Sequence, residues 1–233
     1  MNYLSHTIAK VGKERNGDHL AFLYLEEESI LVAMVADGVS QQPTDWLASE
    51  LACKGFMEQF QKIKHTPLKE RIEASVEHTN EALIATGTKM GSTLSVVIYD
   101  YIQNQFHWSS IGDSRIYRIG PEGLECLTED DVITQNRLVS SQRKTFGEQE
   151  AVLSQAIGQL DISISVETSK LKEDELIIIA SDGFYNARPA SFEKRMLDFY
   201  NQEDRALAFD KLVDQFAMLR GDDLSVIALW PAS

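Results

Sequence analysis

The chain has 233 residues, and 43% of them are hydrophobic, which is enough to bury a sizeable core in one large domain. Its 22 Lys and Arg residues against 36 Asp and Glu residues give a formal net charge of −14. A charge of this sign disfavours a nucleic-acid backbone or an anionic membrane surface as a partner. Because no linker and no repeat is visible, we predict a single domain over residues 1–233.

Cysteine usage and apolar runs indicate the compartment. The two cysteines, Cys53 and Cys126, are too few for a disulfide framework and lack zinc-site spacing, so a reducing cytosol fits best. No signal peptide is apparent, and no apolar run approaches the roughly 20 residues needed to span a bilayer. We therefore expect a soluble, cytoplasmic protein.

Hydrophobic periodicity predicts strands and helices in a mixed order. The predicted strands, in chain order, are residues 19–25, 30–36 and 92–100, two short strands on either side of 112–114, then 176–180 and 224–230. The predicted helices are one opened by Pro43, one capped by Thr66 and Pro67, and two around 192–200 and 204–219. Short connections indicate antiparallel neighbours, and alternating βαβ units are not seen. The pattern favours an α+β layered domain in which helices cover antiparallel sheets.

Acidic residues recur at the ends of the predicted strands. Asp37 and Asp182 follow apolar strands, Asp113 lies in a tight turn, and Asp18 and Asp222 come just before strands. Any one Asp-Gly pair is ordinary turn chemistry, because Gly accepts a positive φ. Five acids at strand ends can instead converge on one rim, where their mutual repulsion calls for a cation.

The donor types indicate which cation. Because no Cys or His stands at ligand spacing, an all-oxygen shell favours Mg²⁺ or Mn²⁺ over Zn²⁺. Two such ions a few Å apart convert a bridging water to hydroxide at neutral pH and can clamp a phosphoryl group in line. The pattern therefore favours metal-assisted phosphoryl chemistry.

A series of motifs carries a family resemblance. In order they are "KERNGDHLAF", "VADGVS", "MGSTLSVVIYD", "IGDSRIYRIG", "LTEDD", "LSQAIGQ", "IIIASDGF" and "GDDLSVIAL". Together they resemble the type-2C, metal-dependent protein serine/threonine phosphatases in their compact bacterial form, from Lys13 to Leu229. The resemblance implies a four-layer αββα sandwich, in which two antiparallel β-sheets are flanked by helix pairs.

The resemblance also implies a metal centre with two Mn²⁺ or Mg²⁺ ions. By motif position, Asp37 would bridge the two ions, and the Gly38 carbonyl would help to hold one. Asp182 and Asp222 would complete the shell of one ion, and Asp18 would serve the other.

The resemblance further implies that Asp113 with Asp182 would hold a looser third ion, of the kind seen in many bacterial relatives. Catalysis would then depend on Asp37 and Asp182 through a metal-activated water, without a phospho-enzyme. The expected partners are phosphorylated proteins and an opposing serine/threonine kinase in a signalling pathway.

The sequence departs from the family pattern near the first metal-site acid. Lys13 stands where the family usually has an Arg that grips the substrate phosphate, so Lys13 and Arg15 are the candidate phosphate contacts. Gly17 replaces the acidic residue usually found before Asp18. Neither "VSQQPTDW" nor "LTEDDVI" supplies the family's His, so the general acid stays unassigned. Residues 139–149 occupy the place of the variable flap and are a candidate substrate-contact loop.

Four other interpretations compete with this one. A cysteine phosphatase is disfavoured because neither cysteine precedes an Arg-containing phosphate loop. A serine nucleophile is disfavoured because no Gly-x-Ser-x-Gly elbow is present. A catalytically weakened binding module is favoured by Lys13 and Gly17 but opposed by the five retained acids. A hydrolase of small phosphate esters would use the same metal site with another substrate.

Overall fold

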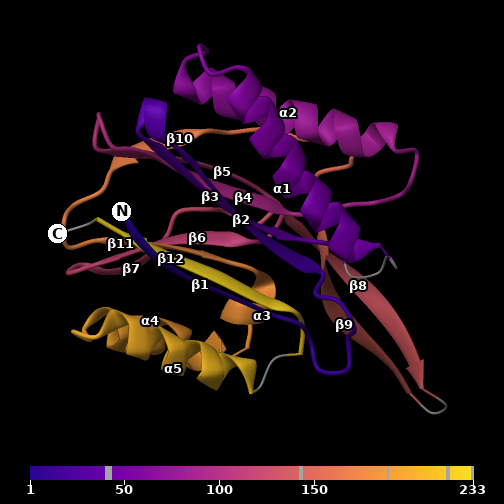
Figure 1. Cartoon of the computed structure of the whole chain (residues 1–233). Helices are drawn as coiled ribbons and strands as arrows, with labels where there is room; N and C mark the ends of the chain where they lie inside the picture. The colour runs from indigo at the N-terminus through magenta and orange to yellow at the C-terminus, as the bar shows by residue number, and fades with distance from the viewer. Residues whose placement is uncertain (40–43, 142–143, 188, 219–220, 232–233) are drawn as a thin grey trace.

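Two five-stranded antiparallel sheets form the centre of the part of the chain that the structure describes (Figure 1). The computed structural model describes residues 1–39, 44–141, 144–187, 189–218 and 221–231, with the backbone alone at 135–141, 144–151 and 189. The first sheet has the order β1 (Asn2–Ile8), β12 (Leu224–Trp230), β11 (Leu176–Ala180), β6 (Arg115–Gly120) and β7 (Gly123–Cys126). The second has the order β10 (Glu167–Lys170), β5 (Gln105–Ile111), β4 (Leu94–Asp100), β3 (Ile30–Asp37) and β2 (Asp18–Leu25).

Helices cover the outer face of each sheet and give four layers. In Figure 1, α1 (Asp45–Lys62) and α2 (Leu68–Ala85) lie over the second sheet, and α4 (Phe192–Tyr200) and α5 (Arg205–Ala217) lie over the first. Buried side chains form three clusters: one beneath each helix pair and one between the two sheets. The predicted αββα sandwich is therefore confirmed. Within the described residues, no helix combines the length and apolar character needed to cross a membrane.

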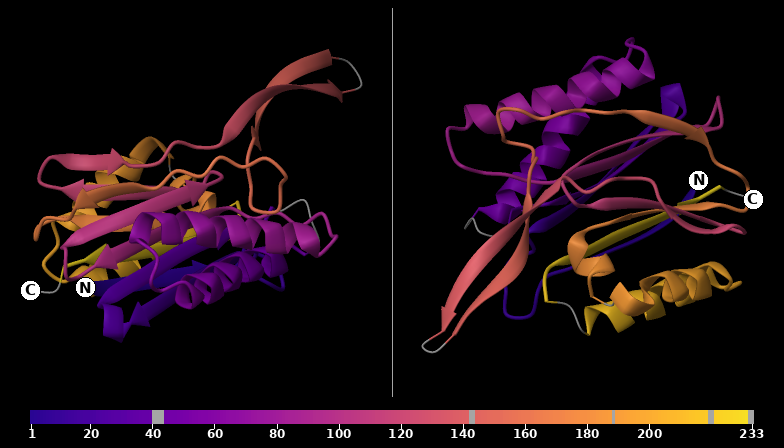
Figure 2. Two further views of the ribbon diagram at one scale, coloured as in Figure 1. Left: turned by 90° about the horizontal axis from the view of Figure 1, so that it is seen from above. Right: turned by 180° about the vertical axis from the view of Figure 1, so that it is seen from behind.

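A long hairpin departs from this four-layer body. Strands β8 (Val132–Ser141) and β9 (Lys144–Leu153) pair only with each other and project away from the sandwich in both views of Figure 2. The predicted flap, residues 139–149, is the outer part of this hairpin, although residues 142 and 143 lie outside the described residues.

Several predicted boundaries need correction. The second helix begins at Leu68 with Pro67 as its N-cap, and no side chain caps it, because Pro67 rather than Thr66 occupies the cap position. The first helix begins at Asp45, and Pro43, predicted to open it, lies outside the described residues, as does Leu219 at the predicted end of the last helix. Strand β1 was not predicted at all.

Candidate metal centre

The five predicted acids lie at one end of the sandwich. Asp18 opens β2 and Asp37 closes β3, and these two residues are register partners in the antiparallel pair. Asp113 lies in the turn between β5 and β6, Asp182 comes two residues after the end of β11, and Asp222 comes two residues before the start of β12. The carboxylate of Asp37 interacts electrostatically with those of Asp18, Asp113 and Asp182, and Asp182 interacts with Asp222. The structure thus brings the predicted acids together from both sheets.

Burial and mutual repulsion change how these acids ionise. Burial, against which hydrogen bonds to the carboxylate act, raises the pKa of Asp18 to about 7. Burial and the neighbouring charge of Asp182 raise the pKa of Asp113 to about 6. Burial, followed by the charges of Asp18 and Asp182, raises the pKa of Asp37 well above its ordinary value. Burial and the charge of Asp222 also raise the pKa of Asp182.

Two oxygens at this rim have no hydrogen-bond partner. Among the described residues, the buried side-chain atoms without a partner are Asp18 Oδ1, Asp182 Oδ1 and Ser109 Oγ. The neighbouring carboxyl of Asp37 also affects the pKa of Asp18 and of Asp182. Unpartnered buried carboxylate oxygens are costly, and they are satisfied when a cation binds.

The donor set fits a hard divalent cation. All of the candidate side-chain ligands are carboxylates, which Mg²⁺ and Mn²⁺ prefer. In the described part of the chain, no group of three or more Asp, Glu, His or Cys side chains already stands in the arrangement of a metal shell. A cation that binds here would therefore require these carboxyls to release any protons that they hold and to adjust their positions.

Steric crowding explains why glycine follows Asp37 and Asp182. A Cβ at Gly38 would lie 2.0 Å from the carbonyl oxygen of Asp45, and a Cβ at Gly183 would lie 1.7 Å from that of Asp223. Neither glycine has a positive φ, so the ordinary turn explanation for an Asp-Gly pair does not apply to them. Glycine is required because another backbone segment packs directly against each turn. Gly112, beside Asp113, does adopt a positive φ of 100°.

Buried hydroxyls position the rim acids. The Asp37 N–H donates to Thr93 Oγ1 at 2.8 Å, and Thr93 Oγ1 lies 2.8 Å from Ser114 Oγ in the Asp113 turn. Ser181 Oγ donates to Asp18 Oδ2 at 2.7 Å and accepts from the Ser225 N–H at 2.9 Å. Sequence reasoning missed these roles of Ser114 and Ser181. The available signal was a small hydroxyl residue beside Gly or Asp at each strand end.

An aromatic and basic cluster also supports the Asp113 turn, and it was not predicted. Tyr185 Oη donates to the Asp113 carbonyl oxygen at 2.8 Å, which ties α3 (Asp182–Tyr185) to the turn. The Arg115 guanidinium lies 3.9 Å from the centre of the Tyr185 ring. Arg115 also forms a two-pronged pair with Asp130, at 2.8 and 2.7 Å. These contacts connect two of the candidate metal loops.

The predicted phosphate contacts are both engaged within the protein. Lys13 Nζ donates to Asp45 Oδ2 at 2.7 Å and to Asp223 Oδ2. The Arg15 guanidinium lies 4.1 Å from the centre of the Trp46 ring, and Arg15 is otherwise exposed. Arg15 is thus the more accessible of the two cations at this edge.

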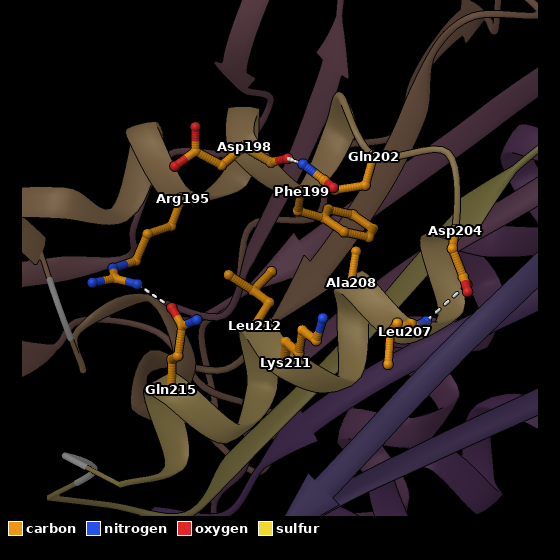
Figure 3. A pocket seen from close by; sticks show the side chains of 10 residues that line it. All are labelled: Arg195, Asp198, Phe199, Gln202, Asp204, Leu207, Ala208, Lys211, Leu212 and Gln215. Carbon is orange, nitrogen blue, oxygen red and sulfur yellow. Dashed lines mark hydrogen bonds between the residues drawn. The ribbon is translucent and has the colours of Figure 1, made fainter.

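A groove between α4 and α5 lies away from these acids. It has a volume of about 200 Å³ and is lined by ten side chains, among them Phe199, Leu207 and Lys211 (Figure 3). None of the predicted site residues lines it. The groove therefore belongs to the helical layer and not to the candidate centre.

Comparison with known proteins identifies the family. The family model described as "Protein phosphatase 2C" matches residues 9–223, which is nearly the whole chain. The chain belongs to the protein phosphatase 2C family. It is accordingly a phosphoprotein phosphatase of the metal-dependent class that uses Mn²⁺ or Mg²⁺. A search of the curated proteins gave no significant match.

Solved structures show that the fold is that of the protein phosphatase 2C family. The Mycobacterium tuberculosis serine/threonine phosphatase PstP/Ppp is 18% identical, with a TM-score of 0.77 and 99% of both chains covered. The phosphatase MsPP from Mycobacterium smegmatis, solved with cacodylate, is 21% identical, with a TM-score of 0.77 over 100% of this chain and 99% of that one. The catalytic domain of PstP with two manganese ions is 18% identical, with a TM-score of 0.73 over 97% and 96% of the two chains.

Proposed function

We propose that this protein phosphatase 2C member hydrolyses phosphoserine and phosphothreonine in proteins at the five-acid rim, with two Mn²⁺ or Mg²⁺ ions and a third in the looser position. The observation that carries this proposal is the convergence of five carboxyls from both sheets, with two buried oxygens that lack partners. Burying such a cluster of like charges without a cation costs folding free energy, and no purpose other than binding a cation is evident for it.

The geometry supports a division of roles among the acids. Asp37 interacts with three of the other four and is the natural bridging ligand, with the Gly38 carbonyl beside it. Asp182 and Asp222 would serve one ion, and Asp18 the other. When bound, the cations activate a water and neutralise charge on the phosphoryl group. The protein's part is to hold the carboxylates fixed, which the Thr93, Ser114 and Ser181 hydroxyls support.

The third position would use Asp113 with Asp182. Asp113 interacts electrostatically with Asp182, and its turn is tied to Tyr185 on one side and to the hairpin base on the other. The Gly112 N–H donates to Asp131 Oδ2 at 2.9 Å, and the Asp131 N–H donates to the Gly112 carbonyl at 3.0 Å. The hairpin is thus anchored beside the candidate centre, which supports residues 139–149 as the substrate-contact flap.

For the substrate phosphate we favour Arg15, because a guanidinium offers a two-pronged contact and this one is exposed. Lys13 remains the second candidate from the family pattern, although two carboxylates already hold its ammonium. The physiological partners we propose are cytoplasmic phosphoproteins of a signalling pathway and the kinase that opposes it. The two free cysteines support a reducing compartment.

The test is hydrolysis by the purified protein under defined metal conditions. An aryl phosphate, a phosphothreonine peptide and a sugar phosphate are each supplied with Mn²⁺, with Mg²⁺ or with chelator. We expect metal-dependent turnover that prefers the peptide and is lost in Asp182→Asn. The exposed Asp198→Asn in α4 is the matched control and should keep its activity. Turnover in chelator, or an unchanged rate for Asp182→Asn, would contradict the assignment.

A second candidate is a phosphatase-like binding module. The observation that favours it is the engagement of Lys13 by two carboxylates beside Gly17, at the place where the family binds phosphate. A folded protein that binds the phosphothreonine peptide but releases no phosphate with either metal would favour this candidate. Preferential hydrolysis of the sugar phosphate would instead favour a small-ester hydrolase.

A further inference from the structure

A buried ionic cluster joins three segments next to the five-acid rim. Lys13 Nζ hydrogen-bonds Asp45 Oδ2, at the start of α1, and Asp223 Oδ2, in the loop before β12. The side chains of Asp45 and Asp223 are only 7% and 3% exposed. These two acids come from 32 and 210 residues away in the chain. One ammonium therefore holds together segments that have no other ionic link among the described residues.

Asp223 accepts three hydrogen bonds from this loop. Its Oδ1 accepts the Lys10 N–H at 2.7 Å, and its Oδ2 accepts the Gly17 N–H at 2.8 Å in addition to Lys13. Because Asp223 directly follows Asp222, and Gly17 directly precedes Asp18, the cluster is one residue away from two candidate metal ligands. It therefore sets the backbone at both of these rim acids.

Gly17 leaves room for the ammonium. A Cβ at residue 17 would lie 2.8 Å from Lys13 Nζ, 2.8 Å from Asp223 Oδ2 and 3.0 Å from Asp45 Oδ2. The ammonium group of Lys13 thus occupies the space into which a side chain at residue 17 would extend. Gly17 does not have a positive φ, so its lack of a side chain is explained by this crowding.

The ammonium is neither free nor neutral. Two of its three N–H donors point to carboxylates, and its side chain is 27% exposed. Although partial burial lowers the pKa of Lys13, the hydrogen bonds to Asp223 and Asp45 outweigh it and raise the pKa above its usual range. Two buried carboxylates that lost this counter-ion would be left uncompensated, which is strongly destabilising.

We propose that Lys13 is a positioning residue, an internal cation that locks the loops carrying Asp18 and Asp222, and that it is not a contact to the substrate phosphate. Only the kinetic part of this proposal rests on the proposed phosphatase activity, since the lock itself is a property of the metal-free fold.

The first test uses the metal-free protein and needs no activity. Lys13→Met should lower the melting temperature in chelator by roughly 5–15 °C, as expected for breaking a buried pair in a chain of this size. Lys10→Met is the matched control, because it removes one exposed positive charge from the same loop and should melt like the wild type. The double variant Lys13→Met with Asp223→Asn removes the ammonium and one of its two carboxylates, and should lose less than the sum of the losses in the two single variants. If the losses in melting temperature simply add in the double variant, Lys13 does not hold these loops through Asp223, and the proposal is wrong.

The second test separates positioning from phosphate contact. With Mn²⁺ and an aryl phosphate, the double variant should keep KM within about threefold of the wild type while kcat falls and the Mn²⁺ concentration for half-saturation, measured by calorimetry, rises. A tenfold or larger rise in KM with kcat unchanged would show that Lys13 grips phosphate and would overturn the proposal. If the wild type shows no turnover, the proposed function fails, and the melting and calorimetric measurements still decide the role of Lys13.

Discussion

Replacing Asp18 by Asn should stabilise the metal-free protein while it disables the centre. Asp18 is buried, with a pKa raised from 3.8 to about 7. The folded protein therefore keeps a proton that the unfolded chain has released between about pH 4 and pH 7. Stability falls as pH rises through this window, because the folded state binds more protons there. At about 1.4 kcal/mol per pH unit, the loss reaches about 4 kcal/mol at pH 8.

The Asn side chain avoids this cost. Its carbonyl oxygen can still accept the hydrogen bond from Ser181 Oγ, which spans 2.7 Å in the wild type. For a chain of this length, about 4 kcal/mol corresponds to a rise of roughly 10 °C in melting temperature at pH 8. Well below pH 4 the two proteins should differ little, because both the folded and the unfolded state of the wild type then hold the proton.

The assay is thermal unfolding in chelator at pH 5 and pH 8, followed by the same scans with Mn²⁺. The exposed Asp161→Asn is the matched control and should not shift at either pH. Added Mn²⁺ should stabilise the wild type much more than Asp18→Asn. A melting temperature for Asp18→Asn that equals or falls below the wild type at pH 8 in chelator would refute the reasoning about burial and repulsion.

Three further predictions concern the supports of the rim and its metal. Gly183→Ala should destabilise the fold severely, because its Cβ would lie 1.7 Å from a backbone oxygen, whereas Gly221→Ala meets nothing within 4 Å and should melt near the wild type; equal melting would contradict this. Tyr185→Phe should cost about 1 kcal/mol of unfolding free energy in urea, since it loses a part-buried hydrogen bond to the Asp113 carbonyl. The hydrogen bond from Tyr200 to the Asp174 carbonyl has the same length but is exposed, so Tyr200→Phe should lower the unfolding free energy by less. A larger loss for Tyr200→Phe than for Tyr185→Phe would contradict a supporting role of Tyr185 at the Asp113 turn. Chelator should abolish turnover without unfolding the protein, as followed by far-ultraviolet circular dichroism, because the hydrophobic clusters do not depend on the rim; cooperative unfolding in chelator would show otherwise.

The strands next to the candidate metal-site acids could be predicted from the sequence because they are predominantly apolar. Residues 176–180 and 224–230 were predicted with the bounds that the structure shows, since both strands are buried on both faces. Strand β1 was missed because Asn2–Ile8 is polar and apolar in no clear alternation, and its pairing with β12 joins the two ends of the chain. Local patterns carry no information on such a distant partner.

The acids of the site could be placed from their position at strand ends, but the groups that hold them could not. The hydroxyl of Ser181 reaches Asp18 across 163 residues of sequence. Lys13 appeared to be a free cation in the sequence, and its engagement depends on carboxylates that only the fold brings to it. The reason for glycine after Asp37 and Asp182 was also hidden, because it lies in the close approach of another backbone.

The most direct test of the central claim is phosphate release from a phosphothreonine peptide by the wild type and by Asp37→Asn, titrated with Mn²⁺. Asp37 interacts with three of the other rim acids, so loss of its carboxylate should impair the proposed two-ion centre most. We predict saturable, Mn²⁺-dependent release by the wild type, and a loss of at least about a thousandfold in Asp37→Asn, consistent with removal of metal-assisted catalysis. Equal rates for the two proteins, or release that does not depend on Mn²⁺, would contradict a metal centre built on these five acids.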